Sequence, residues 1–182
     1  GVTASVKQSL LDHRERRKYN TWVKLHQITI KDRRTFRNKI AAFNAVPKLS
    51  IIMPVYDVEE KWLRLCIESV IAQIYENWEL CIADDCSPSP HIKTVLNEYS
   101  SKDSRIKVEF RSENGHISAA SNSALKLATG EFCILLDHDD ELSEDALFWV
   151  ASEINEHPNV QMIYSDEDVI DINGRRSDPK FK

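Results

Sequence analysis

Glycine is scarce in this sequence, with only Gly1, Gly115, Gly130 and Gly174 among 182 residues. Neither G-x-G-x-x-G nor G-x-x-x-x-G-K-[ST] occurs. The dinucleotide-binding and P-loop designs, which cradle phosphates in glycine-rich loops, are therefore excluded. A phosphate-bearing ligand would have to be neutralised by other means, and a metal ion is the means we expect.

Long apolar runs and cysteine motifs are also missing. No uncharged apolar run approaches the roughly 20 residues that span a bilayer, and the N-terminus has no apolar signal core. The four cysteines form no C-x-x-C pair and no zinc spacing. Cys66, Cys81 and Cys133 lie in apolar stretches, as is typical of small buried side chains in a reducing compartment. We therefore expect a cytoplasmic protein.

Charge is divided unevenly along the chain. Residues 1–48 carry 12 Lys/Arg and 3 Asp/Glu, a net +9, whereas residues 49–182 carry 12 and 26, a net −14, and the sum is the overall −5. The basic arm permits peripheral contact with an anionic membrane, at the inner face, or with an acidic partner. A solvated helical face, or an arm folded back on the acidic body, accounts for the same charges and is the favoured interpretation. Arg14–Lys18 has little aromatic interleaving beyond Tyr19 and Trp22, so no nucleic-acid partner is expected.

The hydropathy pattern divides the chain near residue 47. Residues 1–47 predict a basic helical extension, in which Thr29 and Asp32 have capping-box spacing and Val46-Pro47-Lys48 ends the second helix. Residues 48–182 predict one α/β domain. Strands are expected at 49–53, 79–83, 106–110, 132–136 and 161–164, and helices at 59–73, 90–100, 117–128 and 143–156, the last with Ser143 as its N-cap. This alternation indicates βαβ units and a mostly parallel sheet flanked by helices.

Polar residues follow each expected strand, where parallel sheets bind ligands. They are Pro54-Val55-Tyr56-Asp57, Asp84-Asp85, Asn114-Gly115-His116, Asp137-His138-Asp139-Asp140 and Ser165-Asp166-Glu167-Asp168. Carboxylates gathered at one sheet edge repel each other unless a cation neutralises them, and hard oxygen ligands suit Mg²⁺ or Mn²⁺. Asp137 and Asp139 are the candidate metal ligands, although a polar loop that caps the next helix would have the same residues.

Two further turns supply candidate ligand contacts. Asp84 and Asp85 precede Cys86-Ser87, so we expect one of the two to hold a turn and the other to accept hydrogen bonds from a base or ribose. Asn114, Gly115, His116 and Ser118 enter a helix, whose free N–H groups and positive dipole suit phosphate. His116 would add a donor there, or would be merely structural.

The series Ser50–Tyr56, Cys66–Gln73, Trp78–Ser87, Glu113–Asn122, Ala128–Phe132 and Leu135–Asp140 resembles family 2 glycosyltransferases of the GT-A fold, which is Rossmann-like. The resemblance covers about residues 49–182. Tyr164–Asp168 and Asp178–Lys182 resemble the bacterial surface-polysaccharide, O-antigen branch with its rhamnosyltransferase-like members. The leading helices resemble the extension of that branch.

The resemblance implies roles for these residues. Pro54, Val55 and Tyr56 would line the base and ribose, Asp84 or Asp85 would bind the base, and His116 would lie near the phosphates. Asp139 would be the main metal ligand and Asp137 would face the ribose or a metal-bound water, with Asp57 and His138 also in the nucleotide-sugar site. The donor would be a UDP- or dTDP-sugar, and the acceptor a glycan or lipid-linked glycan. Transfer would be inverting, as is usual in the family.

The sequence departs from the pattern of the family in one respect: the catalytic base of the family usually lies well after the acidic motif, and no such segment is found before Lys182. Asp166, Glu167 and Asp168 are the nearer candidates, and we expect a donor-binding fragment with weak or absent transfer. Two other functions remain open: another metal-dependent α/β nucleotidyl- or phosphotransferase, and a non-catalytic nucleotide-binding module.

Overall fold

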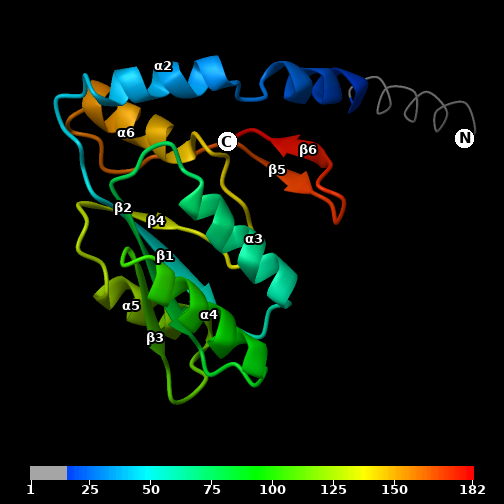
Figure 1. Ribbon diagram of the computed structural model, residues 1–182, viewed down its shortest axis with the longest axis vertical. Helices are drawn as coiled ribbons and strands as arrows, with labels where there is room; N and C mark the ends of the chain where they lie inside the picture. Colours follow the sequence, from blue (N-terminus) through cyan, green and yellow to red (C-terminus); the bar gives the residue numbers. More distant parts are fainter. Residues whose placement is uncertain (1–15) are drawn as a thin grey trace, which may run out of the picture. The chain divides into compact units, whose positions relative to one another are not determined.

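The computed structural model describes residues 16–182 and shows an α/β protein (Figure 1). The chain forms two compact units, one of Thr35–Asn159 and one of Gly1–Arg34 with Val160–Lys182. Arg14, Glu15 and the rest of residues 1–15 lie outside the described part. The expected division near residue 47 stays a prediction.

The larger unit contains a four-stranded parallel sheet of order β3-β2-β1-β4. Its strands are β1 (Leu49–Val55), β2 (Trp78–Asp84), β3 (Ile106–Phe110) and β4 (Phe132–Leu135). The two central strands, β1 and β2, are buried almost throughout because they have strands on both sides and helices on both faces. The expected parallel sheet is thus confirmed for these four strands.

The helices α3 (Glu60–Ile71), α4 (Pro90–Lys102), α5 (His116–Lys126) and α6 (Ala146–Glu156) connect and cover the strands. Ala120 and Ala124 of α5 pack on Ile52, next to Cys81 and Ala83 of β2, and these small side chains let the helix approach the sheet closely. Cys66 of α3 contacts Met53 of β1. Neighbouring strand residues point to opposite faces, so α5 and α3 lie on opposite sides of the sheet.

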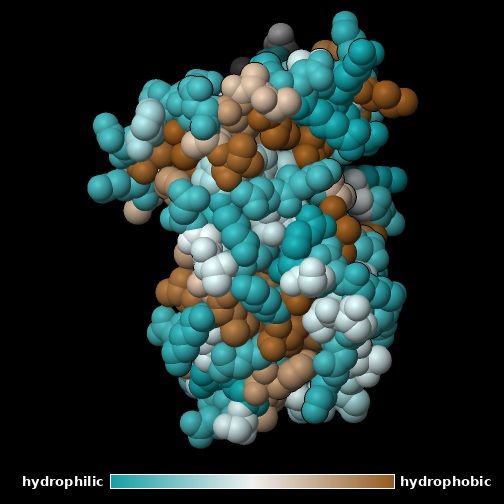
Figure 2. Space-filling view, turned by 60° about the vertical axis from the view of Figure 1, so that its left-hand side comes forward, coloured by the Kyte–Doolittle hydropathy of each residue, from teal (hydrophilic) through white to brown (hydrophobic). Residues whose placement is uncertain are grey.

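Apolar surface remains on the edge strand β4. Leu135 is 80% exposed and Cys133 is also exposed. The face of the molecule drawn in Figure 2 is mostly hydrophilic, with smaller apolar areas between the polar side chains. The expected burial of Cys133 is wrong, and β4 is an edge strand that pairs on one side only, with β1.

The buried carboxylate of Glu79 links the amino ends of β1, β2 and β3, at the edge of the sheet opposite the one where these strands end. Glu79 of β2 accepts hydrogen bonds from Ser50 Oγ at 2.7 Å and from Lys107 Nζ at 2.7 Å, and Lys48 Nζ lies 2.8 Å away. It also accepts from the backbone of Thr129 and Gly130. Burial alone would raise the pKa of Glu79, but these bonds outweigh it and lower the pKa well below its usual range.

Helix α2 (Ile30–Ile40) has the expected capping box. Thr29 N–H donates to Asp32 at 2.9 Å, and Asp32 N–H donates to Thr29 Oγ1 at 3.3 Å. The helix ends earlier than the expected Val46-Pro47, because the backbone of Ala45 leaves it to exchange two hydrogen bonds with the Asn155 amide of α6. Phe43 then stacks on Phe148 of α6, and Phe36 packs against the same ring at a tilt.

The smaller unit contains a helix at residues 16–25 and an antiparallel hairpin of β5 (Glu167–Ile170) and β6 (Arg176–Lys180). The expected strand at 161–164 is wrong, since those residues pair with no strand and Met162 and Tyr164 are 83% and 71% exposed. The strand that the structure has is β5, further along the chain, because Gly174, at φ +74°, forms the turn that pairs β5 with β6. Among residues 16–182 no helix is both long and apolar enough to cross a membrane.

Candidate functional site

The loops after β1, β2, β3 and β4 meet at the carboxyl edge of the sheet, around a cavity of about 480 Å³. This size suits a small organic ligand. The cavity is lined by Pro54, Val55, Tyr56, Asp85, Asn114, His116, Ile117, Ala120, Asp137, His138 and Asp139. Four expected strand-end loops therefore contribute to a single site.

Several expected site residues do not line this cavity. The carboxylate of Asp84 accepts hydrogen bonds from the Ser87 hydroxyl and backbone N–H, so it holds the turn after β2. Asp57 accepts a hydrogen bond from Ser89. Gly115 and Ser118 are chain neighbours of the lining residues His116 and Ile117 but do not line the cavity themselves. Of these two aspartates, Asp84 stabilises the turn after β2 and Asp85 lines the cavity.

Asp85 organises the turn before α5. Its carboxylate is 2.7 Å from Nε of Arg111 and accepts the Gly115 N–H at 3.0 Å. Arg111 also donates to the Ala119 carbonyl and the Ser123 hydroxyl. Asp85 is almost fully buried, so these partners offset the cost of desolvating its charge. One face of the site is thereby fixed by an ion pair.

Arg111 was not foreseen from the sequence although it directly follows β3, because the prediction considered only Asn114-Gly115-His116 after that strand. Ile117 and Ala120, which line the cavity from α5, were also missed. The sequence could nevertheless have predicted that Ile117 and Ala120 line the cavity. Once α5 was placed with its first residues at the site, positions one turn apart along it would share the cavity-facing side.

His116 begins α5 in a left-handed conformation, at φ +62°. This backbone region is unfavourable for residues with a side chain. Asn114 Oδ1 accepts the His116 N–H at 3.2 Å and so stabilises the turn. The strain turns the His116 side chain toward the cavity that it lines.

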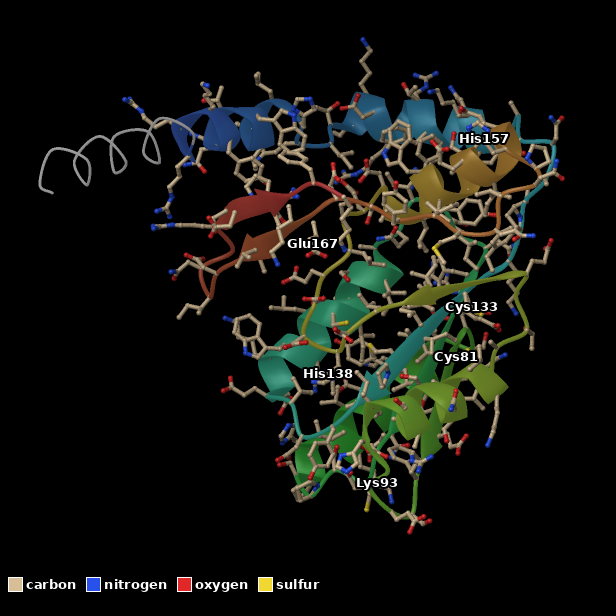
Figure 3. The ribbon with its side chains drawn as sticks, turned by 180° about the vertical axis from the view of Figure 1, so that it is seen from behind. Cys81, Lys93, Cys133, His138, His157 and Glu167 are labelled. Carbon is tan, nitrogen blue, oxygen red and sulfur yellow. The ribbon has the colours of Figure 1, made fainter. Side chains whose placement is uncertain are left out.

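The loop after β4 brings Asp137, His138 and Asp139 to the cavity. Figure 3 labels His138 in this loop. Nδ1 of His138 lies 3.0 Å from the Pro54 carbonyl oxygen of β1. A carbonyl only accepts, so Nδ1 carries the proton and a neutral His138 keeps its Nε2 lone pair as an acceptor. Among residues 16–182 no group of three or more His, Cys, Asp or Glu side chains forms a ready metal site.

Asp166, Glu167 and Asp168 belong to the smaller unit, where each has partners. Asp168 accepts hydrogen bonds from Tyr19 and Arg176, and Asp166 accepts the Lys182 N–H. Lys182 and Lys180 lie beside Glu167 and lower the pKa of its carboxyl. A lowered pKa makes a carboxylate a weaker base.

The family model for glycosyl transferase family 2 matches residues 50–181, which include all four cavity-lining loops. The chain belongs to this family. It is 37% identical over 143 residues to the O-antigen biosynthesis protein RfbC of Myxococcus xanthus, covering 79% of this chain and 11% of that protein.

Another relative, from Escherichia coli, is the UDP-Glc:alpha-D-GlcNAc-diphosphoundecaprenol beta-1,3-glucosyltransferase WfgD, 34% identical over 69% of this chain and 47% of that protein. This family 2 chain therefore spans less than half of either relative. Among solved structures, Staphylococcus aureus TarS 1–349 in complex with UDP-GlcNAc matches with a TM-score of 0.56 and 27% identity, over 70% of this chain and 41% of that one. The expected GT-A fold is confirmed.

Proposed function

We propose that this chain is the donor-binding part of a glycosyltransferase that builds a surface polysaccharide, and that its cavity holds a nucleoside-diphospho-sugar. The observation that carries the proposal is the convergence of four loops on one cavity that contains Asp137, Asp139 and His116. The O-antigen relative and the UDP-GlcNAc complex of a similar structure support the substrate class.

The cavity has two chemically different ends. Pro54, Val55 and Tyr56 of β1 and its loop, with the buried Asp85, provide an apolar wall and an anionic acceptor suited to a nucleobase and ribose. A UDP-sugar is our first choice of donor, by similarity to TarS, and a dTDP-sugar the second. His116 and the N–H groups at the start of α5 would face the diphosphate.

The residues after β4 fit a divalent cation, Mn²⁺ or Mg²⁺. Asp137 and Asp139 both line the cavity, and Mg²⁺ usually takes one or two protein carboxylates and completes its shell with phosphate and water. A bound ion would act as a Lewis acid that stabilises the leaving nucleoside diphosphate. Asp139 is proposed as the main ligand and Asp137 as a ligand or ribose contact, while His138 offers an acceptor nitrogen.

Transfer needs an acceptor and a base besides this site. The acceptor is proposed to be a glycan or lipid-linked glycan, which the diphosphoundecaprenol named for the Escherichia coli relative supports. Inverting transfer is proposed from the family. Asp166, Glu167 and Asp168 stay candidates for the base. Asp166 is the first of them to test, since Glu167 and Asp168 form ion pairs with Lys and Arg side chains.

Titration calorimetry with UDP-, dTDP- and GDP-sugars, each with and without Mn²⁺, tests the proposal. The wild type should bind one donor in a metal-dependent way, and Asp139→Ala should lose at least ~10-fold in affinity. Release of a nucleoside diphosphate indicates glycosyl transfer or hydrolysis, whereas release of a monophosphate would favour a nucleotidyl- or phosphotransferase. Metal-independent binding without turnover would favour a non-catalytic module, and no binding would overturn the proposal.

A second proposal concerns the basic helix at residues 16–25, which we infer lies on the anionic inner face of a membrane. Arg17, Lys18, Thr21, Trp22 and Leu25 share one face and line a shallow hollow. Trp22 and Leu25 are 47% and 76% exposed. Exposed Trp and Leu flanked by cations are typical of interfacial helices.

Vesicle co-sedimentation tests this membrane contact. The protein should bind vesicles that contain phosphatidylglycerol more strongly than neutral phosphatidylcholine vesicles, and added salt should weaken the binding. Trp22→Ser with Leu25→Ser should reduce it, while Ile172→Ser, at an exposed apolar site on the β5–β6 turn, should not. Equal binding to both vesicle types would show that the basic face is merely solvated.

A further inference from the structure

The loop between β4 and α6 carries five consecutive polar positions, Asp137 to Glu141, of which all but His138 are acidic, and the loop belongs to no strand or helix. Such a loop has no regular backbone hydrogen-bond partners. Polar side chains of α3 and of the residues just after it supply several of these partners instead. They are Cys66, Ser69 and Gln73, spaced i, i+3 and i+7, so they lie on one side of the helix and its C-terminal end.

The first contact is at the metal-site end of the loop. Cys66 Sγ lies 3.4 Å from the Asp137 carbonyl oxygen, which also accepts the Asp140 N–H at 3.1 Å. Cys66 is fully buried. Its thiol lies between two acceptors, the Asp137 carbonyl oxygen and Met53 Sδ, each 3.4 Å from Sγ, and the carbonyl is the one that belongs to the loop.

The second contact is in the middle of the loop. Ser69 Oγ accepts the Leu142 N–H at 3.1 Å while donating to the Cys66 carbonyl at 2.7 Å. The hydroxyl thus uses both its donor and its acceptor capacity, which fixes its direction. Removal of this hydroxyl would leave the Leu142 N–H without a protein partner.

The third contact is at the far end, where α6 begins. Gln73 is 5% exposed, and its Nε2 donates to the Ser143 carbonyl at 2.7 Å while its Oε1 accepts the Leu147 N–H at 2.9 Å. The expected N-cap, Ser143, does not cap α6, and the residue at that position, Asp145, makes no side-chain cap bond. Gln73, which lies just after the C-cap of α3, therefore caps α6 from a distant part of the chain.

We propose that Cys66, Ser69 and Gln73 are positioning residues that set the Asp137–Glu141 loop in the geometry that binds the metal and diphosphate. The inference rests on the proposed function of the cavity. Adjacent carboxylates repel one another and favour a spread loop in the absence of a cation. One contact holds Asp137 and the others hold Leu142 and Ser143, directly after the acidic run. Together they oppose that spreading, so the site is preorganised before the ion arrives. Groups that orient metal ligands in this way affect metal affinity strongly.

Gln73→Met and Ser69→Ala test this role, with Tyr99→Phe as the matched control. Tyr99 donates to Glu68 at 2.8 Å, so its loss removes one α3–α4 hydrogen bond and leaves all three loop contacts intact. Mn²⁺ affinity is measured by electron paramagnetic resonance in the presence of UDP, and UDP affinity is measured by calorimetry without metal. Thermal unfolding shows how much stability each variant loses.

Gln73→Met should weaken Mn²⁺ binding about 10-fold and Ser69→Ala by less, with metal-free UDP affinity unchanged. Ser69→Thr keeps the hydroxyl and should restore most of the loss. Tyr99→Phe should lower stability without changing Mn²⁺ affinity. Unchanged Mn²⁺ affinity in folded Ser69→Ala and Gln73→Met would overturn the inference, as would an equal loss in Tyr99→Phe. Failure of the wild type to bind Mn²⁺ with UDP would instead overturn the proposed function.

Discussion

The carboxylate of Asp85 and the guanidinium of Arg111 form an ion pair of 2.7 Å beside the cavity, although 26 residues separate them in the chain. The pair connects the end of β2 to the turn before α5, because Asp85 also accepts the Gly115 N–H. Its geometry fixes both the anionic wall of the cavity and the start of the helix that faces the diphosphate in our proposal.

Arg111→Met should lower the free energy of unfolding by about 3 kcal/mol, because it leaves the buried Asp85 charge without its partner. Nucleotide affinity should fall as well, since the turn at Gly115 and His116 loses its anchor. Chemical denaturation and calorimetry measure the two effects. A variant with wild-type stability and affinity would show that Asp85 is sufficiently stabilised by the Gly115 N–H alone.

Gly115→Ala should distort the same turn for a steric reason. A Cβ at this position would lie 2.6 Å from Nη2 of Arg111 and 2.7 Å from Cβ of Ala119. Both atoms must shift, and we expect a loss of about 2 kcal/mol of stability, as for other overpacked sites. Thermal unfolding checks this. Asn114→Ala, which adds no atoms near Arg111, should cost less, and the reverse order would contradict the steric argument.

The neutral imidazole of His138 should carry its proton at Nδ1 rather than at Nε2. The reason is its contact with the Pro54 carbonyl, which can only accept. Nitrogen-15 chemical shifts of the imidazole report this tautomer directly. His138→Ala should weaken nucleotide binding by roughly 10-fold if Nε2 accepts a hydrogen bond from the ligand. An Nε2–H tautomer would refute the assignment.

Glu79→Gln should reduce stability at neutral pH by about 2 kcal/mol, less than for a wholly buried pair because Lys48 and Lys107 are 38% and 34% exposed. The pKa of Glu79 is lowered in the folded state. Its contribution is therefore present above the unfolded-state pKa of about 4.3 and is lost as the pH falls toward the folded-state value. Denaturation at pH 7 and pH 3 should show the gap between variant and wild type narrowing, and a constant gap would be evidence against the depressed pKa.

Local sequence patterns predicted several elements well. Apolar β-branched runs located β1 and β2, and the Thr29–Asp32 spacing located the start of α2. The Asn173-Gly174 turn was overlooked, and its hairpin signal would have placed β5 and β6 where the structure has them. Ser143 failed as an N-cap because a side chain 70 residues earlier, Gln73, bonds to its carbonyl and takes over the capping.

The sequence by itself determined that Asp137, His138 and Asp139 follow a strand and that the chain resembles a nucleotide-sugar transferase. It could do so because hydropathy period and strand-end position are local properties. Only the tertiary structure decided that Asp85 rather than Asp84 faces the cavity, that Arg111 holds it, and that α3 secures the acidic loop. Those outcomes depend on which distant groups satisfy each buried donor and acceptor, and no spacing along the chain specifies these partners.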